Sequence, residues 1–171
     1  GDAAKQRYKL LGTDIEDVKK ELLEVNNLAL EGKPEDMVIT SHICRGNYHS
    51  TFFTSGPYDS VADYVFAKEN VDALFLEYDD ARSGGFAPLA KVSPDNKVVL
   101  GLITTKTPQL EDKEVVIKRI HEAAKYIPLD RLYLSPQCGF ASCEIGNKLT
   151  EEEQWAKLKL VKEIAEEVWG E

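Results

Sequence analysis

The sequence predicts an α/β fold in which parallel strands alternate with helices. Four short segments rich in β-branched and other apolar residues are separated by segments whose apolar residues recur every three or four positions. This alternation is typical of parallel sheets joined by right-handed crossovers. A second observation agrees with it. The polar residues that stand out follow the strands, and the carboxyl ends of parallel strands are where such folds place their chemistry.

The four expected strands cover residues 38–44, 73–78, 97–103 and 132–135. The segment 73–78 is apolar almost throughout, which is typical of a strand covered on both faces. Each strand runs into an unusually long polar loop that contains glycine or proline. These loops leave room for a site at one edge of the sheet.

A first helix is expected before the first strand. Thr13 and Glu16 have the spacing of a capping box, and Gly32 followed by Pro34 ends the segment. The apolar residues between them recur at helical spacing and predict an amphipathic helix with an apolar stripe formed by Ile15, Val18, Leu22, Val25 and Ala29.

Further helices are expected between the strands, over about 59–69, 86–91 and 111–126. A second capping box, Thr150 to Glu153, opens the last helix. Its periodicity predicts an inner stripe formed by Trp155, Leu158, Val161, Ala165 and Val168.

Composition predicts one domain over residues 1–171, because 43% of the residues are hydrophobic and can form a core. The formal net charge of -9 argues against nucleic acid or an anionic membrane as the main partner. No apolar run approaches the roughly 20 residues of a membrane span, and no secretory signal pattern is present. Three cysteines, an odd number, fit a reduced cytoplasmic protein.

One pair of residues opens the question of a metal site. His42 and Cys44 lie at the end of the first expected strand. Because successive strand residues point to opposite faces, these two side chains project to the same side. An imidazole and a thiol placed in this way can bind one metal ion, zinc before others. Two ligands alone are weak evidence.

Two more candidate ligands follow other strands, namely Glu77 and Cys138. Taken singly, each candidate has an ordinary alternative: a hydrogen-bonded core histidine, a strand-end carboxylate or a small buried thiol. Together they form an imidazole, two thiols and a carboxylate at one edge of a parallel sheet, a set that zinc accepts. Arg82 and the neighbouring aspartates can support these ligands from the rim.

Three motifs carry a resemblance: His-x-Cys at 42–44, Leu-Glu-Tyr-Asp-Asp-Ala-Arg-Ser at 76–83, and Ser-Pro-Gln-Cys-Gly-Phe at 135–140. They resemble the C-terminal half of the cobalamin-independent methionine synthase family, in its shorter single-barrel branch. The resemblance implies a (β/α)8 TIM barrel, of which about four β/α units, a half barrel, are present. It also implies a zinc ion bound by His42, Cys44, Glu77 and Cys138.

The implied activity is that of a 5-methyltetrahydropteroyltriglutamate–homocysteine S-methyltransferase. A methyl group passes from methyltetrahydrofolate to a thiol such as homocysteine and gives methionine. Larger members of the family have a histidine after the third of these strands, and Lys106 takes that place here. The resemblance therefore makes Lys106 a candidate catalytic residue, as a proton donor or as an anchor for an anion.

Four strands would leave two sheet edges and an apolar inner face uncovered. We therefore expect the chain to need another copy or an N-terminal half to complete the barrel, and to be inactive alone. Two alternatives remain open. One is a non-catalytic zinc-binding half-barrel module, and the other is a related barrel enzyme with a different substrate.

Overall fold

The structure is a computed structural model that describes residues 2–141 and 143–170, with side chains from residue 5 onward. Residues 1, 142 and 171 of the expected single domain lie outside that description. Its centre is a four-stranded sheet in the order β1-β2-β3-β4, with every neighbouring pair parallel. The strands are β1 Thr40–Ile43, β2 Ala73–Glu77, β3 Lys97–Ile103 and β4 Leu132–Pro136.

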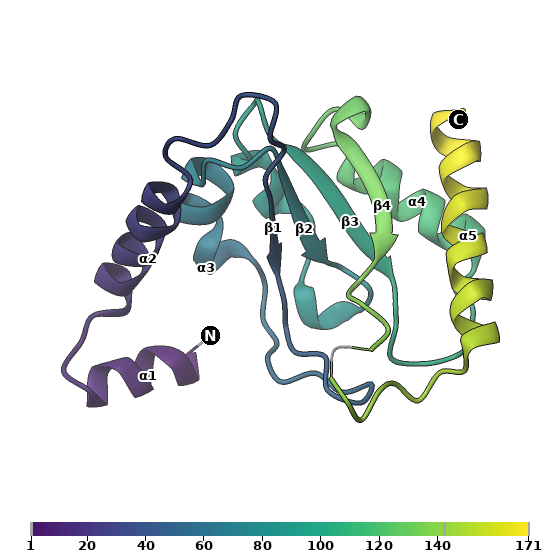
Figure 1. The fold of residues 1–171 in the computed structure, drawn as a ribbon, viewed down its shortest axis with the longest axis horizontal. Coiled ribbons are helices and arrows are strands. Elements are labelled where there is room, and N and C mark those ends of the chain that lie inside the picture. The colour runs from purple at the N-terminus through teal and green to yellow at the C-terminus, as the bar shows by residue number, and fades with distance from the viewer. Residues whose placement is uncertain (1, 142, 171) are drawn as a thin grey trace.

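Helices cover one face and the flanks of this sheet (Figure 1). The α-helices are α1 Asp2–Leu10, α2 Ile15–Ala29, α3 Asp59–Val61, α4 Lys113–Ala123 and α5 Glu151–Trp169. A π-helical turn, Ala62–Phe66, continues α3, and short 3-10 turns follow β2 and precede β4. The expected strand–helix alternation is confirmed, and none of the described helices is long and apolar enough to cross a membrane.

The main core lies between the sheet and its helices. The parallel register places Leu74, Val98 and Leu132 side by side, and each is at most 1% exposed. Four aromatic rings extend this core, with neighbouring ring centroids 4.7 to 5.5 Å apart: Tyr58, Phe66, Tyr78 and Phe86. The near-continuous apolar composition of β2 and β3 thus reflects burial within the sheet.

The opposite face of the sheet is open. His42, Phe75, Val99 and Tyr133 share one register row there, and Tyr133 is 41% exposed. A cavity of about 400 Å³ over this face is lined by residues of β1, β2 and β4 and of the loop after β4. Within the described residues, β1 and β4 each pair with a strand on one side only. The chain therefore forms an open half barrel, as the sequence predicts.

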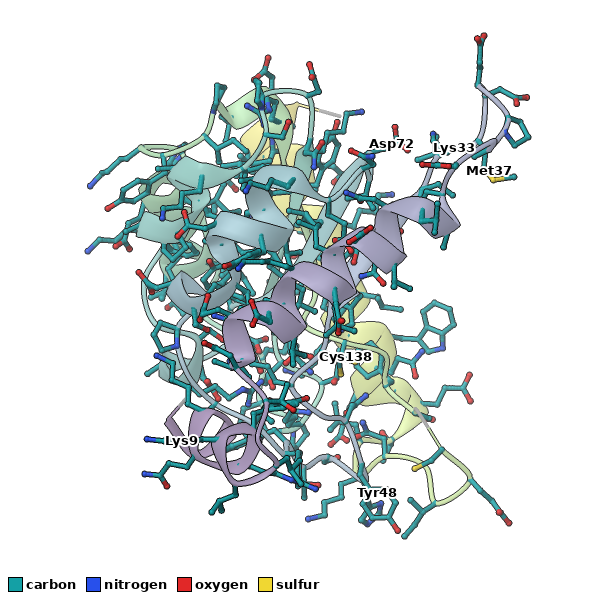
Figure 2. All side chains as sticks on the ribbon, turned by 90° about the vertical axis from the view of Figure 1, so that its left-hand side faces the viewer. Lys9, Lys33, Met37, Tyr48, Asp72 and Cys138 are labelled. Atoms are coloured by element: carbon teal, nitrogen blue, oxygen red, sulfur yellow. The ribbon has the colours of Figure 1, made fainter. Side chains whose placement is uncertain are left out.

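The helix predicted before the first strand is present as α2, but its apolar stripe is not buried in the core. This helix has no buried residue, and Leu22 and Val25 are 57% and 60% exposed. Its attachment is polar: Asn27 donates a hydrogen bond to the carbonyl oxygen of Lys68 and accepts one from the backbone of Asn70. Figure 2 shows α2 along the outside of the molecule, with Lys33 and Asp72 close together beyond its C-terminal end. Within the described residues, the apolar stripe is therefore covered only at its start, where Ile15 and Val18 are half-buried.

Two helix starts test the capping predictions. The box at Thr150 is confirmed, because its side chain accepts from the backbone of Glu153 while the carboxylate of Glu153 accepts from the backbone of Thr150. The one at Thr13 is wrong by one residue. Asp14 is the N-cap of α2, and its carboxylate accepts from the backbone of Glu16.

The inner stripe predicted for α5 is confirmed only in part, because Val161 and Val168 are half-buried against the core whereas Trp155 is 60% exposed. The residues that this helix buries are Lys157, Leu160 and Ile164. The two stripes lie on neighbouring faces of the same helix. Tertiary contacts select between them, because Lys157 has an ionic partner in the loop after β3.

Candidate metal centre

All four predicted ligands come together at the carboxyl edge of the sheet. His42 lies in β1 and Cys44 directly follows that strand, Glu77 ends β2, and Cys138 lies two residues past β4. One potential ligand atom from each side chain lies within 4.8 Å of all the others. The parallel register produces this convergence, because it aligns the ends of the strands that carry them.

The spacing of the ligand atoms fits one tetrahedral metal ion. Two sulfurs about 2.3 Å from a tetrahedral zinc lie about 3.8 Å apart, and a nitrogen and an oxygen at about 2.1 Å lie about 3.4 Å apart. The observed separations are 4.0 Å between the sulfurs of Cys44 and Cys138 and 3.5 Å between His42 Nε2 and Glu77 Oε1. The cluster could therefore bind a metal ion.

The environment of Glu77 also fits a cation. Its side chain is fully buried, and His42 Nε2, 3.5 Å from Glu77 Oε1, is too far away for a short hydrogen bond. The nearest cationic side chain besides His42 is Arg82, whose Nη2 lies 3.5 Å from Glu77 Oε2. Arg82 is mainly bound elsewhere, at 2.7 Å from Asp79 and 2.9 Å from Asp80. A buried carboxylate with free lone pairs is costly unless a cation approaches it.

The ligand side chains perturb one another. Hydrogen bonds to Cys138 and then to Glu77 raise the pKa of His42 to about 10. The same bond to His42 lowers the pKa of the Cys138 thiol. Burial opposes ionisation of Glu77, but the interactions with His42 and other donors leave its pKa below the usual value. Without metal, a proton on His42 balances this negative charge, and a divalent cation would compete with that proton.

We expect the Cys138 thiol to be the most reactive of the three in the metal-free chain. Its lowered pKa gives thiolate at a lower pH, and the thiolate is the nucleophile that attacks an alkylating agent. At pH 7, iodoacetamide should label Cys138 faster than the exposed Cys143, as read by peptide mass spectrometry. His42→Gln should slow this labelling. Equal rates at the two cysteines would contradict the effect of His42 on the Cys138 thiol.

A glycine in β3 allows the backbone segments that carry Glu77 and Cys138 to lie close to this strand. A Cβ built on Gly101 of β3 would lie 2.7 Å from the Cα of Gln137 and 2.9 Å from the carbonyl oxygen of Leu76. Those two residues directly precede the ligands Cys138 and Glu77. Gly101 lies inside the expected strand 97–103, and no functional or structural role was predicted for it. The available signal was a glycine inside an apolar strand, which often marks a close backbone approach.

Lys106 lies beside the centre, in the loop after β3. Its Nζ donates to the carbonyl oxygens of Gly46 and Thr51, at 3.0 and 3.2 Å, and to Oδ1 of Asn47 at 3.3 Å. Burial lowers the pKa of its ammonium group. The catalytic role expected for Lys106 stays a prediction. What the structure shows is a lysine bound to the loop that follows the first two ligands.

Comparison with known proteins places the chain among methionine synthase relatives. The model of the cobalamin-independent synthase catalytic domain matches residues 19–167. The uncharacterized protein YxjH of Bacillus subtilis is 52% identical over 98% of this chain and 45% of its own length. A Bacillus licheniformis 5-methyltetrahydropteroyltriglutamate–homocysteine methyltransferase is 25% identical over 98% of this chain and 20% of its own length.

A solved structure of a similar protein has the same fold as this chain. A Listeria monocytogenes protein assigned as a vitamin-B12 independent methionine synthase superposes with a TM-score of 0.72 at 42% identity, over 94% of this chain and 44% of that one. The chain thus spans less than half the length of the relatives that it matches. The family match over most of the sequence and the shared half-barrel fold lead to one conclusion: this chain belongs to the cobalamin-independent synthase family, within the region of its catalytic domain.

Proposed function

We propose that this chain carries the zinc centre of a methyltransferase that acts on a thiol. The observation that supports this most strongly is the cluster of His42, Cys44, Glu77 and Cys138, whose ligand atoms lie within 4.8 Å of one another, in a member of this family. Zinc bound there would hold the substrate sulfur as a thiolate at neutral pH. The proposed acceptor is homocysteine, the proposed donor is methyltetrahydrofolate, and the product is methionine.

The protein side chains set the charge of this centre. Two thiolates and the Glu77 carboxylate carry three negative charges against the two positive charges of zinc. A third thiolate from the substrate would therefore remain electron-rich and nucleophilic. In the transfer, the carbon–nitrogen bond of the donor breaks, a carbon–sulfur bond forms, and the departing pterin nitrogen takes up a proton. The open cavity beside His42 and Cys138 gives a thiol access to the centre.

The remaining substrate contacts are proposed to come from a partner segment. The inner face of the sheet is open and both edge strands lack a second neighbour within the described residues. Exposed apolar residues at the β1 flank add to this surface: Leu22, Val25, Leu28 and Val38. Another copy of the chain or an N-terminal half would cover these surfaces and complete the barrel.

The first experiment is native mass spectrometry of the purified chain together with metal analysis. We expect one zinc per chain, and a homodimer or a complex with a separate N-terminal half. Addition of homocysteine to the zinc-loaded chain at pH 7 should release about one proton per site, because the thiol binds as a thiolate. A chain that binds no zinc would overturn the proposal.

A methyl-transfer assay separates the two functional alternatives. Formation of methionine from methyltetrahydrofolate and homocysteine by the completed barrel would support the enzyme. Zinc binding at one equivalent without proton release or transfer would favour a non-catalytic zinc module. Proton release with a thiol other than homocysteine would instead favour a related enzyme with a different substrate.

A further inference from the structure

Lys106 uses its whole hydrogen-bonding capacity on one loop. An ammonium group has three protons, and three acceptors lie within 3.3 Å of Nζ, contributed by Gly46, Asn47 and Thr51. In this arrangement no proton remains for a substrate. The side chain therefore connects the loop after β3 with the loop that follows His42 and Cys44.

The loop that Lys106 holds contacts one thiol ligand directly and the residue that follows the other. The backbone nitrogen of Gly46 lies 3.3 Å from Cys44 Sγ and donates to it. The side-chain amide of Asn47 donates to the carbonyl oxygen of Gly139, which directly follows Cys138, at 2.6 Å. Because Lys106 fixes both Gly46 and Asn47, it joins the loop of one sulfur ligand to the loop of the other.

Lys106 is itself anchored from the far side of the molecule. Its backbone nitrogen donates to Oγ1 of Thr104 at 3.2 Å, and the Thr104 nitrogen donates to the Glu111 carboxylate at 2.8 Å. Lys157 of α5, whose side chain is fully buried, lies 3.1 Å from both oxygens of that carboxylate. Its ammonium also donates to the carbonyl oxygen of Gln109 at 2.7 Å. This ion pair fixes the start of the loop that carries Lys106.

We propose that Lys106 is a positioning residue that sets the separation of the Cys44 and Cys138 sulfurs, with the buried Lys157–Glu111 pair as its anchor. The proposal rests on the proposed zinc centre. In this role Lys106 does not donate a proton to the substrate. It acts on the metal ligands through the loops that carry Cys44 and Cys138. Partners of this kind, which orient metal ligands without binding the metal, typically contribute 10- to 100-fold to metal affinity.

The test is zinc affinity, measured by competition with a chromophoric chelator. Lys106→Met keeps the length of the side chain and removes its donors, and should raise the zinc dissociation constant roughly 10- to 100-fold. The matched control is Lys148→Met, which should leave the dissociation constant unchanged. Lys148 is exposed, and its ammonium group forms no hydrogen bond or ion pair with the described residues. The thiolate-to-cobalt absorption of the Co²⁺-loaded variant should also weaken, because a displaced sulfur overlaps poorly with the metal.

The outcomes separate this inference from the proposed function. If the unmodified chain binds no zinc, the zinc centre itself is wrong. If it binds zinc and Lys106→Met binds it equally, only the positioning role is wrong. A proton-donor role would instead leave zinc affinity intact and change the pH dependence of methyl transfer by the completed barrel.

Two further variants keep the proposal testable if Lys106→Met does not fold. Asn47→Leu removes the link to Gly139 at nearly constant volume and should weaken zinc binding by a similar factor. Lys157→Met combined with Glu111→Gln neutralises the anchor without leaving an unpaired buried charge, and should weaken zinc binding several-fold. Unchanged affinity in both would overturn the proposal.

Discussion

Replacing Cys138 by alanine should abolish stoichiometric zinc binding at micromolar protein concentration. The variant loses a thiolate and leaves Cys44, His42 and the buried Glu77 around an incomplete coordination shell. We expect the zinc dissociation constant to rise by more than the roughly 100-fold that loss of an outer-sphere partner costs. Metal analysis after gel filtration, followed by chelator competition, measures the change.

The chain contains its own control for this experiment. Cys143 lies five residues after Cys138 and is exposed outside the four-residue cluster. Cys143→Ala should therefore bind zinc like the unmodified chain. Retention of zinc by Cys138→Ala, or its loss from Cys143→Ala, would show that the ligand assignment is wrong.

The Gly101→Ala variant should have the second-largest effect, and it should change both folding and metal binding. The new methyl group would meet backbone atoms of Gln137 and Leu76 at 2.7 and 2.9 Å, and backbone cannot rotate away as a flexible side chain can. Forced overpacking of this kind costs about 1–3 kcal/mol, and we expect the upper part of that range here. Because those residues directly precede Cys138 and Glu77, zinc affinity should fall as well.

Urea unfolding of the metal-free chain and zinc competition measure the two parts of this effect. Gly85→Ala is the matched control, because a Cβ there would meet nothing within 4 Å and the backbone does not have a positive φ. It should leave both quantities unchanged. An unaltered unfolding free energy in Gly101→Ala would mean that the strands can separate without cost.

The strands and the four ligand candidates could be predicted because their signals are local. Runs of apolar residues identify the strands, and parallel pairing then places every strand end at the same edge. His42, Cys44, Glu77 and Cys138 needed only that rule to be brought together. The distances between them depend on register and strand twist, which sequence patterns do not encode.

The buried helix faces could be predicted only in part, because their burial depends on what packs against them. In α5, periodicity favoured the stripe through Trp155, whereas the structure buries Lys157 beside Glu111. A lysine is a poor candidate for a buried position unless its partner is known, and that partner lies in another element. In α2, Leu22 and Val25 are exposed because no other described element packs against them. The sequence of the helix itself does not show which elements pack against it.

The placement of all four ligand candidates on one unit of consecutive strands, β1 to β4, has a consequence for evolution. A gene fusion, duplication or split at the boundary before β1 would leave the cluster undivided. The rest of the barrel could then diverge while the candidate metal centre remained the same. Differences in function between relatives would then be concentrated in the part of the barrel that covers the open face of the β1–β4 sheet.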